Sequence, residues 1–159
     1  MIFVTTGTQA PFDRFLKMVD ELAGDFDEEV VAQAITSDYE PQNLKMVGFI
    51  PPDEFNRIFA EARIVIAHAG MGTIISALTG NKPIIVVPRL AYLGEHRNEH
   101  QMVTAMRMNE LGYVHVVYDK KQLRELLISS EELQCLRTID KGASESLVSS
   151  LIDFISQKQ

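Results

Sequence analysis

The chain has 159 residues, of which 46% are hydrophobic, so its length and apolar content suit one domain with a sizeable core. Its 22 acidic and 15 basic side chains give a net charge of −7, which repels a phosphate backbone and disfavours nucleic acid as a partner. A single cysteine, Cys135, forms no internal disulfide, and the composition suits a reducing compartment such as the cytoplasm. We therefore expect residues 1–159 to form one cytoplasmic domain.

Short apolar runs rich in β-branched residues alternate with segments of helical period along the chain. This alternation is typical of βα units that build a parallel sheet buried on both faces. The sequence therefore predicts an α/β fold, a Rossmann-like parallel sheet flanked by helices. Strands are expected at residues 1–5, 29–35, 45–48, 63–67, 84–88 and 113–117.

The first strand starts at the beginning of the chain, where no basic segment precedes the apolar residues. This run is too short for a signal peptide, so we expect no leader. The other apolar runs fall far below the roughly 18 residues of a membrane span. We expect any membrane attachment to come from a partner.

Helices are expected in most gaps between the strands. The first has Pro11 in its first turn, and its apolar residues share one face, with Arg14 on a solvated face. The second covers residues 53–62, with Asp53 as its cap, and the third follows Gly70. Residues 145–157 should form a packed terminal helix, and residues 36–43 a loop.

Ligands of open parallel sheets bind at the carboxyl ends of the strands. Three loops with unusual residues should meet there, namely residues 5–9, 68–73 and 88–101. In the second loop, Gly70, Gly72 and Thr73 open a helix, so backbone N–H groups and the helix dipole would face an anion such as a diphosphate. Alternatively, the two glycines only make a tight turn and His68 is a core residue.

Two other phosphate-binding patterns are disfavoured. A dinucleotide fingerprint needs a third glycine where this chain has Ile75, and no Gly-Lys-Ser/Thr phosphate loop occurs. The spacing from His96 to His100 does not establish a metal site, so no metal is expected. The polar residues of 88–101 suit hydrogen bonds to sugar hydroxyls, and the alternative is a solvated helix start.

Together these loops resemble the C-terminal domain of glycosyltransferase family 28, including its stand-alone small subunits of the PssE and Alg13 type. The resemblance covers nearly the whole chain. It rests on three blocks: residues 3–9 with 11–14, residues 68–73 continuing to 82–83, and residues 88–101, the last being most similar to bacterial exopolysaccharide subunits.

The resemblance implies the C-terminal half of a GT-B glycosyltransferase, which binds a UDP-sugar as substrate and needs no cofactor. It implies transfer to a lipid-diphosphate-linked acceptor in exopolysaccharide or capsule synthesis, with a separate membrane-anchored partner of the PssD or Alg14 type. That partner would recruit the chain to the inner face of the membrane, and the isolated chain could self-associate. The residues expected to bind the UDP-sugar are Gly7, Thr8, Gln9, His68, Gly70, Met71, Gly72, Thr73, Ser76, Arg89, Glu95 and Gln101.

The base that deprotonates the acceptor would come from the partner, or from His96 or His100. Ser76 stands where relatives place a glutamate that holds the ribose hydroxyls, and Gln9 stands in a shortened first loop where relatives have a histidine. Losing the charged ribose contact would cost about 1–2 kcal/mol. The sequence thus leaves a non-catalytic regulatory or binding subunit as an alternative. A nucleotide-sugar epimerase is a weaker one, because such enzymes have a second domain.

Overall fold

The computed structural model describes residues 1–35, 39–129, 133–140 and 142. Within these residues the strands form one parallel sheet in the order β3-β2-β1-β4-β5-β6. The strands are β1 (Ile2–Thr5), β2 (Val30–Gln33), β3 (Lys45–Val47), β4 (Ile64–His68), β5 (Ile84–Val87) and β6 (His115–Val116). Each overlaps its predicted range, so the predicted α/β class and parallel sheet are confirmed.

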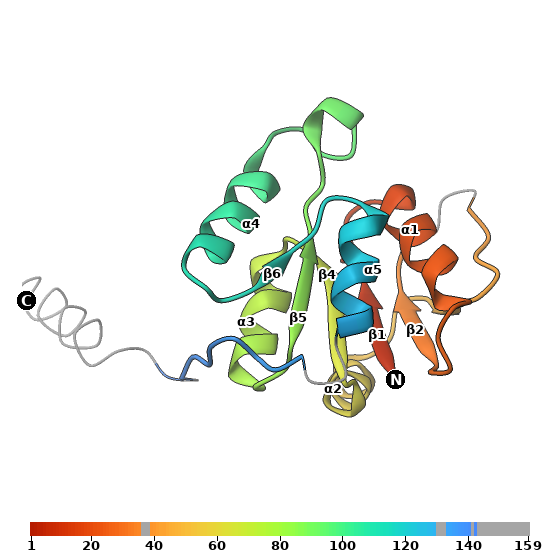
Figure 1. Cartoon of the computed structure of the whole chain (residues 1–159), viewed down its shortest axis with the longest axis horizontal. Helices are drawn as coiled ribbons and strands as arrows, with labels where there is room; N and C mark the ends of the chain where they lie inside the picture. Colours follow the sequence, from red (N-terminus) through yellow and green to blue (C-terminus); the bar gives the residue numbers. More distant parts are fainter. Residues whose placement is uncertain (36–38, 130–132, 141, 143–159) are drawn as a thin grey trace, which may run out of the picture.

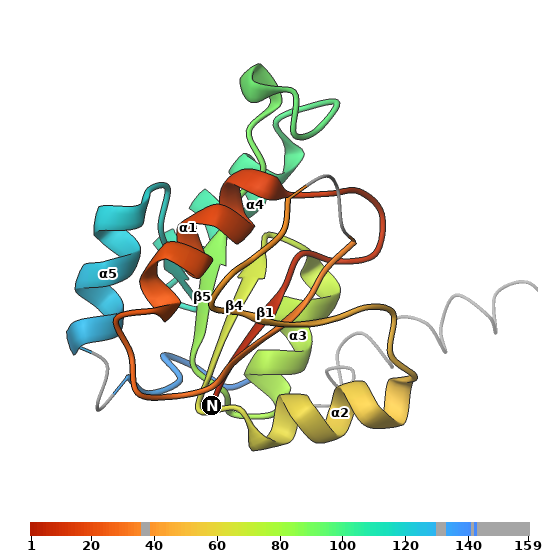
Figure 2. The ribbon, with the colours of Figure 1, turned by 90° about the vertical axis from the view of Figure 1, so that its right-hand side faces the viewer.

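Helices cover both faces of this sheet (Figures 1 and 2). One face carries α1 (Asp13–Ala23) and α5 (Lys120–Ile128), which pack against each other. The other face carries α2 (Pro52–Glu61), α3 (Met71–Thr79) and α4 (His100–Glu110). A short 3-10 helix, η1 (Ala91–Leu93), lies between β5 and α4.

The central strands are buried on both faces because their side chains alternate between two cores. In β1, Ile2 and Val4 enter the core beneath α1 and α5, whereas Phe3 enters the core beneath α2 and α3. Phe3 packs edge-on against Phe55 and Phe59 of α2, with ring centroids 5.4 and 6.2 Å away. The apolar runs of the sequence are therefore explained by burial between two helical layers.

The cap predicted for α2 is wrong. The N-cap is Pro51, Pro52 is the first helical residue, and no side chain caps this helix start. Proline suits the first turn because its missing N–H is not needed there. Asp53 instead lies within that turn, where its negative charge favours the positive end of the helix dipole.

Two other predicted segments lie partly or wholly outside the described residues. The terminal helix predicted at 145–157 is outside them. Of the loop predicted at 36–43, residues 39–43 have neither helix nor strand, as expected. Among the described helices, none has both the length and the apolar character needed to cross a bilayer.

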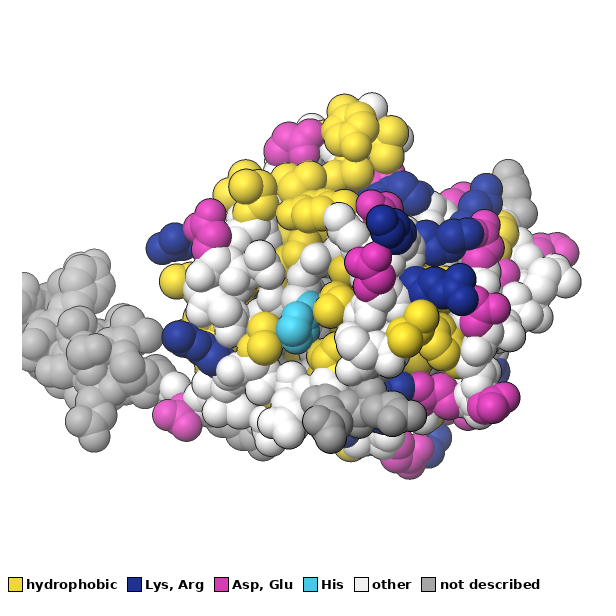
Figure 3. Space-filling view, viewed as in Figure 1, with side chains coloured by type: hydrophobic (Ala, Val, Ile, Leu, Met, Phe, Trp, Pro, Cys, Tyr) yellow, Lys and Arg dark blue, Asp and Glu magenta, His cyan; other side chains and the backbone are white. Residues whose placement is uncertain are grey.

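The strand order creates a topological switch point between β1 and β4, where successive connections leave in opposite directions. The loops that follow β1 and β4 therefore open a crevice at the carboxyl ends of the strands. Above this crevice the chain rises from β5 into η1, whose Tyr92 and Leu93 are 76% and 51% exposed. This loop forms the apolar projection at the top of Figure 3.

Candidate functional site

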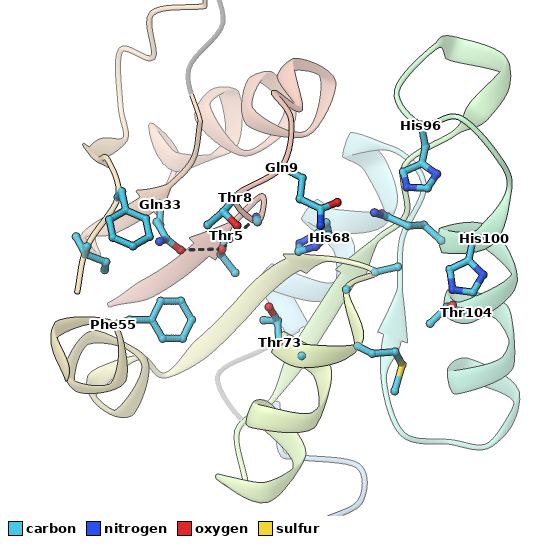
Figure 4. Close-up of a pocket in the computed structure, with 18 of the residues that line it drawn as sticks. Thr5, Thr8, Gln9, Gln33, Phe55, His68, Thr73, His96, His100 and Thr104 are labelled. Atoms are coloured by element: carbon cyan, nitrogen blue, oxygen red, sulfur yellow. Dashed lines mark hydrogen bonds between the residues drawn. The ribbon is translucent and has the colours of Figure 1, made fainter. Parts of the chain in front are cut away.

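A cavity of about 600 Å³ lies at the carboxyl ends of the strands, beside the switch point. Its walls come from the loops after β1 and β4, the start of α4 and the segment between β3 and α2 (Figure 4). The predicted residues that line it are Gly7, Thr8, Gln9, His68, Gly70, Met71, Gly72, Thr73, His96, His100 and Gln101. Three distant loops therefore meet where the sequence placed them.

The start of α3 opens directly on the cavity. Gly70 is its N-cap and makes no side-chain cap, because glycine has no side chain. The N–H groups of Met71, Gly72 and Thr73 have no intrahelical acceptor, and the first such bond runs from Ile74 to the Gly70 carbonyl. A Cβ added at Gly72 would meet nothing within 4 Å, so this backbone is open to a ligand. Unpaired N–H groups and the positive helix end together favour an anion.

His68 forms the floor between the two glycine loops. A Cβ on Gly7 would lie 2.7 Å from the His68 Cε1, and a Cβ on Gly70 would lie 2.3 Å from its Nε2. Both glycines are therefore required by the imidazole. Gly7 also has a φ of +78°, a conformation that side chains disfavour.

The imidazole of His68 is held neutral. Burial, and then the nearby positive charge of Arg89, lower the pKa of His68 to about 4. Its Nδ1 is buried without a hydrogen-bond partner among the described residues. A neutral imidazole at this place offers a donor or an acceptor to a bound molecule without adding charge.

Thr5, from the predicted loop 5–9, and Gln33, which the sequence analysis missed, complete the β1–β2 side of the cavity. The Thr5 hydroxyl donates to the Gln33 Oε1 at 3.1 Å, and it accepts from the Gly7 N–H at 3.3 Å. The Gln33 amide is thereby oriented, and its nitrogen keeps donors for a ligand. A polar glutamine in the otherwise apolar strand Val30–Gln33 was the signal available in the sequence.

The α4 side of the cavity carries Gln101, His96 and His100. The Gln101 Oε1 accepts from the Arg89 backbone N–H at 3.2 Å, which orients the glutamine amide. The Nδ1 of His96 lies 3.0 Å from the Asn98 carbonyl oxygen and 3.4 Å from the Asn98 N–H. The carbonyl contact suits a proton on Nδ1 and the N–H contact suits a proton on Nε2, so the Asn98 backbone accommodates either tautomer of the ring.

One end of the cavity is apolar. Phe49, Ile50, Pro52 and Phe55 line it, and Phe49 is 84% exposed. The sequence analysis missed these residues, because the segment after β3 has no period that distinguishes a ligand-facing side chain. Ala69 of the predicted loop 68–73 and Thr104 of α4 also line the cavity. An exposed aromatic ring there provides a surface on which a planar base can stack.

Among the described residues, no Asp, Glu, Lys or Arg side chain lines this cavity. Magnesium sites use carboxylate oxygens, and this lining supplies none. No group of three His, Cys, Asp or Glu side chains that could hold a metal occurs among the described residues. The arrangement can therefore receive an anion through backbone N–H groups, the helix dipole and neutral side chains.

Three of the predicted binding residues lie outside this lining. Ser76 is exposed on α3, one turn beyond the helix start. Arg89 and Glu95 line a smaller hollow of about 60 Å³ behind the first loop. There their polar atoms bind other parts of the protein, as described below.

The expectation that Arg14 is a solvated residue is wrong. Its side chain is 25% exposed and donates from Nε to the Glu95 Oε1 at 2.7 Å. It also donates to the backbone carbonyls of Pro88 and Tyr118. Helical periodicity alone gave no sign that the loop at 88–95 folds back over the start of α1.

The strand order, the two helical layers and a cavity at the switch point define a Rossmann-like ligand-binding domain. The model of the glycosyltransferase family 28 C-terminal domain matches residues 1–146. The chain therefore belongs to this family.

Curated relatives and solved structures agree with this assignment. The chain is 26% identical over 93 residues to the UDP-N-acetylglucosamine transferase subunit ALG13 of Candida albicans, covering 58% of this chain and 30% of the relative. It is 27% identical over 115 residues to the subunit of the same name from Eremothecium gossypii, covering 72% of this chain and 55% of the relative. The chain thus spans less than two thirds of the length of both relatives.

The fold is shared with solved glycosyltransferase structures. The solution structure of ALG13 matches with a TM-score of 0.57 at 22% identity, over 94% of this chain and 93% of that one. MurG of Acinetobacter baumannii matches with a TM-score of 0.57 at 15% identity, over 80% of this chain and 40% of that one. The fold is that of the C-terminal half of a GT-B glycosyltransferase, as the sequence predicted.

Proposed function

We propose that this chain is the donor-binding catalytic subunit of a two-component glycosyltransferase. It binds a UDP-sugar and acts with a membrane-anchored subunit of the ALG14 type that carries the lipid-diphosphate-linked acceptor. The names of the two relatives support UDP-N-acetylglucosamine as the donor. The product belongs to exopolysaccharide or capsule synthesis, and the partner recruits the chain to the cytoplasmic face of the membrane.

The observation that carries this proposal is the uncapped start of α3 in a cavity whose described lining has no Asp, Glu, Lys or Arg side chain. A protein of net charge −7 attracts a diphosphate only where fixed dipoles outweigh that charge, and the α3 N–H groups provide them. These same groups stabilise negative charge as the UDP leaves, which is the main electrostatic contribution of this subunit to catalysis. The apolar end at Phe49 and Phe55 receives the uracil ring.

The amide, hydroxyl and imidazole side chains that line the cavity have separate proposed roles. Gln9, Gln33 and Gln101 carry amide groups suited to sugar and ribose hydroxyls, and Thr8 and Thr73 add hydroxyl groups. His96 is the stronger candidate for the general base, because it lines the cavity and the Asn98 backbone contacts its Nδ1 and so orients the ring. His100 lies exposed at the start of α4 and is the second candidate.

The proposal is tested in two steps. Calorimetry with UDP on the isolated chain should show saturable binding, with UDP-N-acetylglucosamine preferred in competition over ADP-linked sugars. Co-expression with a membrane-anchored acceptor subunit should then give sugar transfer to membrane lipid. UDP binding without transfer in that complex would favour the non-catalytic subunit, and absence of UDP binding even in the complex would overturn the donor-binding role.

A further inference from the structure

Two arginines and a glutamate form a cluster behind the wall of the cavity that carries His96. We call Arg14, Arg89 and Glu95, together with the Phe12 ring between the two guanidinium groups, the arginine hub. The Arg89 guanidinium lies 4.4 Å and that of Arg14 5.3 Å from the centre of this ring. Phe12 is 1% exposed, so these cation–π contacts are largely shielded from water.

Glu95 is fixed by three hydrogen bonds. Its carboxylate accepts from Nε and Nη2 of Arg14 at 2.7 and 3.0 Å, which is a bidentate pair, and from the Leu90 N–H at 2.9 Å. Arg14 is itself bound to the Pro88 and Tyr118 carbonyls at 2.9 and 3.0 Å. Glu95 is thus tied to α1 and to the ends of β5 and β6.

Arg89 links the loop that carries Glu95 to the loop that follows β1. It is 3% exposed, and its guanidinium donates to the carbonyls of Thr6, Ala10, Pro11 and Glu95. The residues between these carbonyls are Gly7, Thr8 and Gln9, which line the cavity. The arginine hub therefore sets the distance between the wall formed by the first loop and the wall formed by His96.

We propose that Glu95 and Arg14 are positioning residues that hold the His96 imidazole toward the reacting atoms. His96 follows Glu95 directly in the chain, and its own ring contacts the Asn98 backbone, two residues further along the same loop. Those local contacts do not fix the loop relative to the cavity, whereas the bidentate pair does. This inference rests on the proposed role of His96, and it adds two residues that touch no substrate.

The first experiment reads the His96 ring itself in the isolated chain. Carbon-13 relaxation of the His96 imidazole should show an ordered ring in the wild type. Glu95→Gln and Arg14→Gln should lower the order parameter of this ring, and Arg14→Lys should not restore it because an ammonium group makes no bidentate fork. The double variant should match either single variant, since the two residues act as a unit.

Matched controls separate positioning from general stability. Arg57 and Glu61 form an exposed ion pair on α2, so Glu61→Gln should leave the His96 order parameter unchanged. His115 of β6, which lies outside the arginine hub, provides a reference signal. An unchanged His96 order parameter in both Glu95→Gln and Arg14→Gln would overturn the inference, as would an equal change in His115.

Kinetics of the two-subunit complex provide the second readout. Glu95→Gln should lower kcat by about tenfold to hundredfold, as expected for a misplaced catalytic group, and change the donor KM by less than about twofold. Equal losses in kcat and donor affinity would contradict a positioning role. Failure of the wild-type complex to transfer sugar would count against the proposed function. The relaxation of the His96 ring in the isolated chain would still decide whether the arginine hub positions that ring.

Discussion

The first turns of α5 and α3 both carry backbone N–H groups without an intrahelical acceptor, and the two helices differ in what faces those groups. At α5 the Asp119 side chain accepts from the Gln122 N–H at 2.8 Å, so the helix supplies its own anion. At α3 the N-cap is Gly70, and the N–H groups of the first turn point into the cavity without a protein acceptor. The difference leaves the α3 start open to an anion from a bound ligand, as the proposed function requires.

Asp20 gives a third case that sharpens this comparison. Its carboxylate is 3% exposed and accepts from the N–H groups of Gln42, Asn43 and Leu44 and from the Tyr39 hydroxyl. As at α5, a carboxylate of the protein itself accepts from these grouped N–H donors. The α3 start lacks one, although it lies in the same sheet-based scaffold.

The largest expected effect comes from filling the space in front of α3. Gly72→Leu should weaken UDP binding about a thousandfold, or ~4 kcal/mol, because the new side chain occupies the open region at the helix start. The free energy of unfolding should not fall, since glycine inside a helix is unfavourable by about 0.5–1 kcal/mol. Calorimetry and urea unfolding measure the two quantities. Gly72→Ala is the matched control with a smaller loss, and undiminished binding by Gly72→Leu would refute the comparison.

The next effect concerns His68 beneath the α3 start. Its pKa is lowered in the folded state, so the unfolded chain binds more protons as the pH falls from 6.5 to about 4. Folding stability should therefore decrease across that window, by up to about 3 kcal/mol, and be fully present above it. Urea unfolding at several pH values checks this. His68→Asn should flatten the dependence between these limits, and an identical slope in both proteins would contradict the buried neutral imidazole.

Asp20 should show its effect at lower pH. Burial alone raises its pKa, but the hydrogen bonds from Gln42, Tyr39, Asn43 and Leu44 outweigh burial and lower it. Its stabilisation is thus present above the pKa of the unfolded chain and is lost as the pH falls through the folded value. At neutral pH, Asp20→Asn should cost about 2 kcal/mol of unfolding free energy. A variant as stable as the wild type at neutral pH would show that the carboxylate is not needed there.

The smallest expected effect is at α5. Asp119→Ala removes the helix cap and should lower the free energy of unfolding by about 1 kcal/mol. UDP affinity should stay unchanged, because Asp119 lies outside the cavity lining. Chemical denaturation and calorimetry on the same sample test both parts. Loss of UDP affinity in this variant would mean that the two helix starts are coupled, contrary to the comparison.

The fold and much of the cavity could be predicted from sequence because their signals are local. Buried strands such as Ile64–His68 are short apolar runs, and the glycines at 70 and 72 follow a strand directly. The arginine hub could not be predicted, because Arg14 meets Glu95 across 81 positions of the chain. The lining at Phe49 was missed for a related reason: its place depends on how the segment after β3 crosses the sheet edge.

The central claim is that the first-turn N–H groups of α3 bind the diphosphate of the donor, and amide spectra during a UDP titration test it most directly. The nitrogen-15 and proton shifts of the Met71, Gly72 and Thr73 amides should change most, saturating with the affinity found by calorimetry, while the Gln122 amide at the capped start of α5 stays constant. Saturable binding of UDP that leaves these three amides unmoved would contradict the claim.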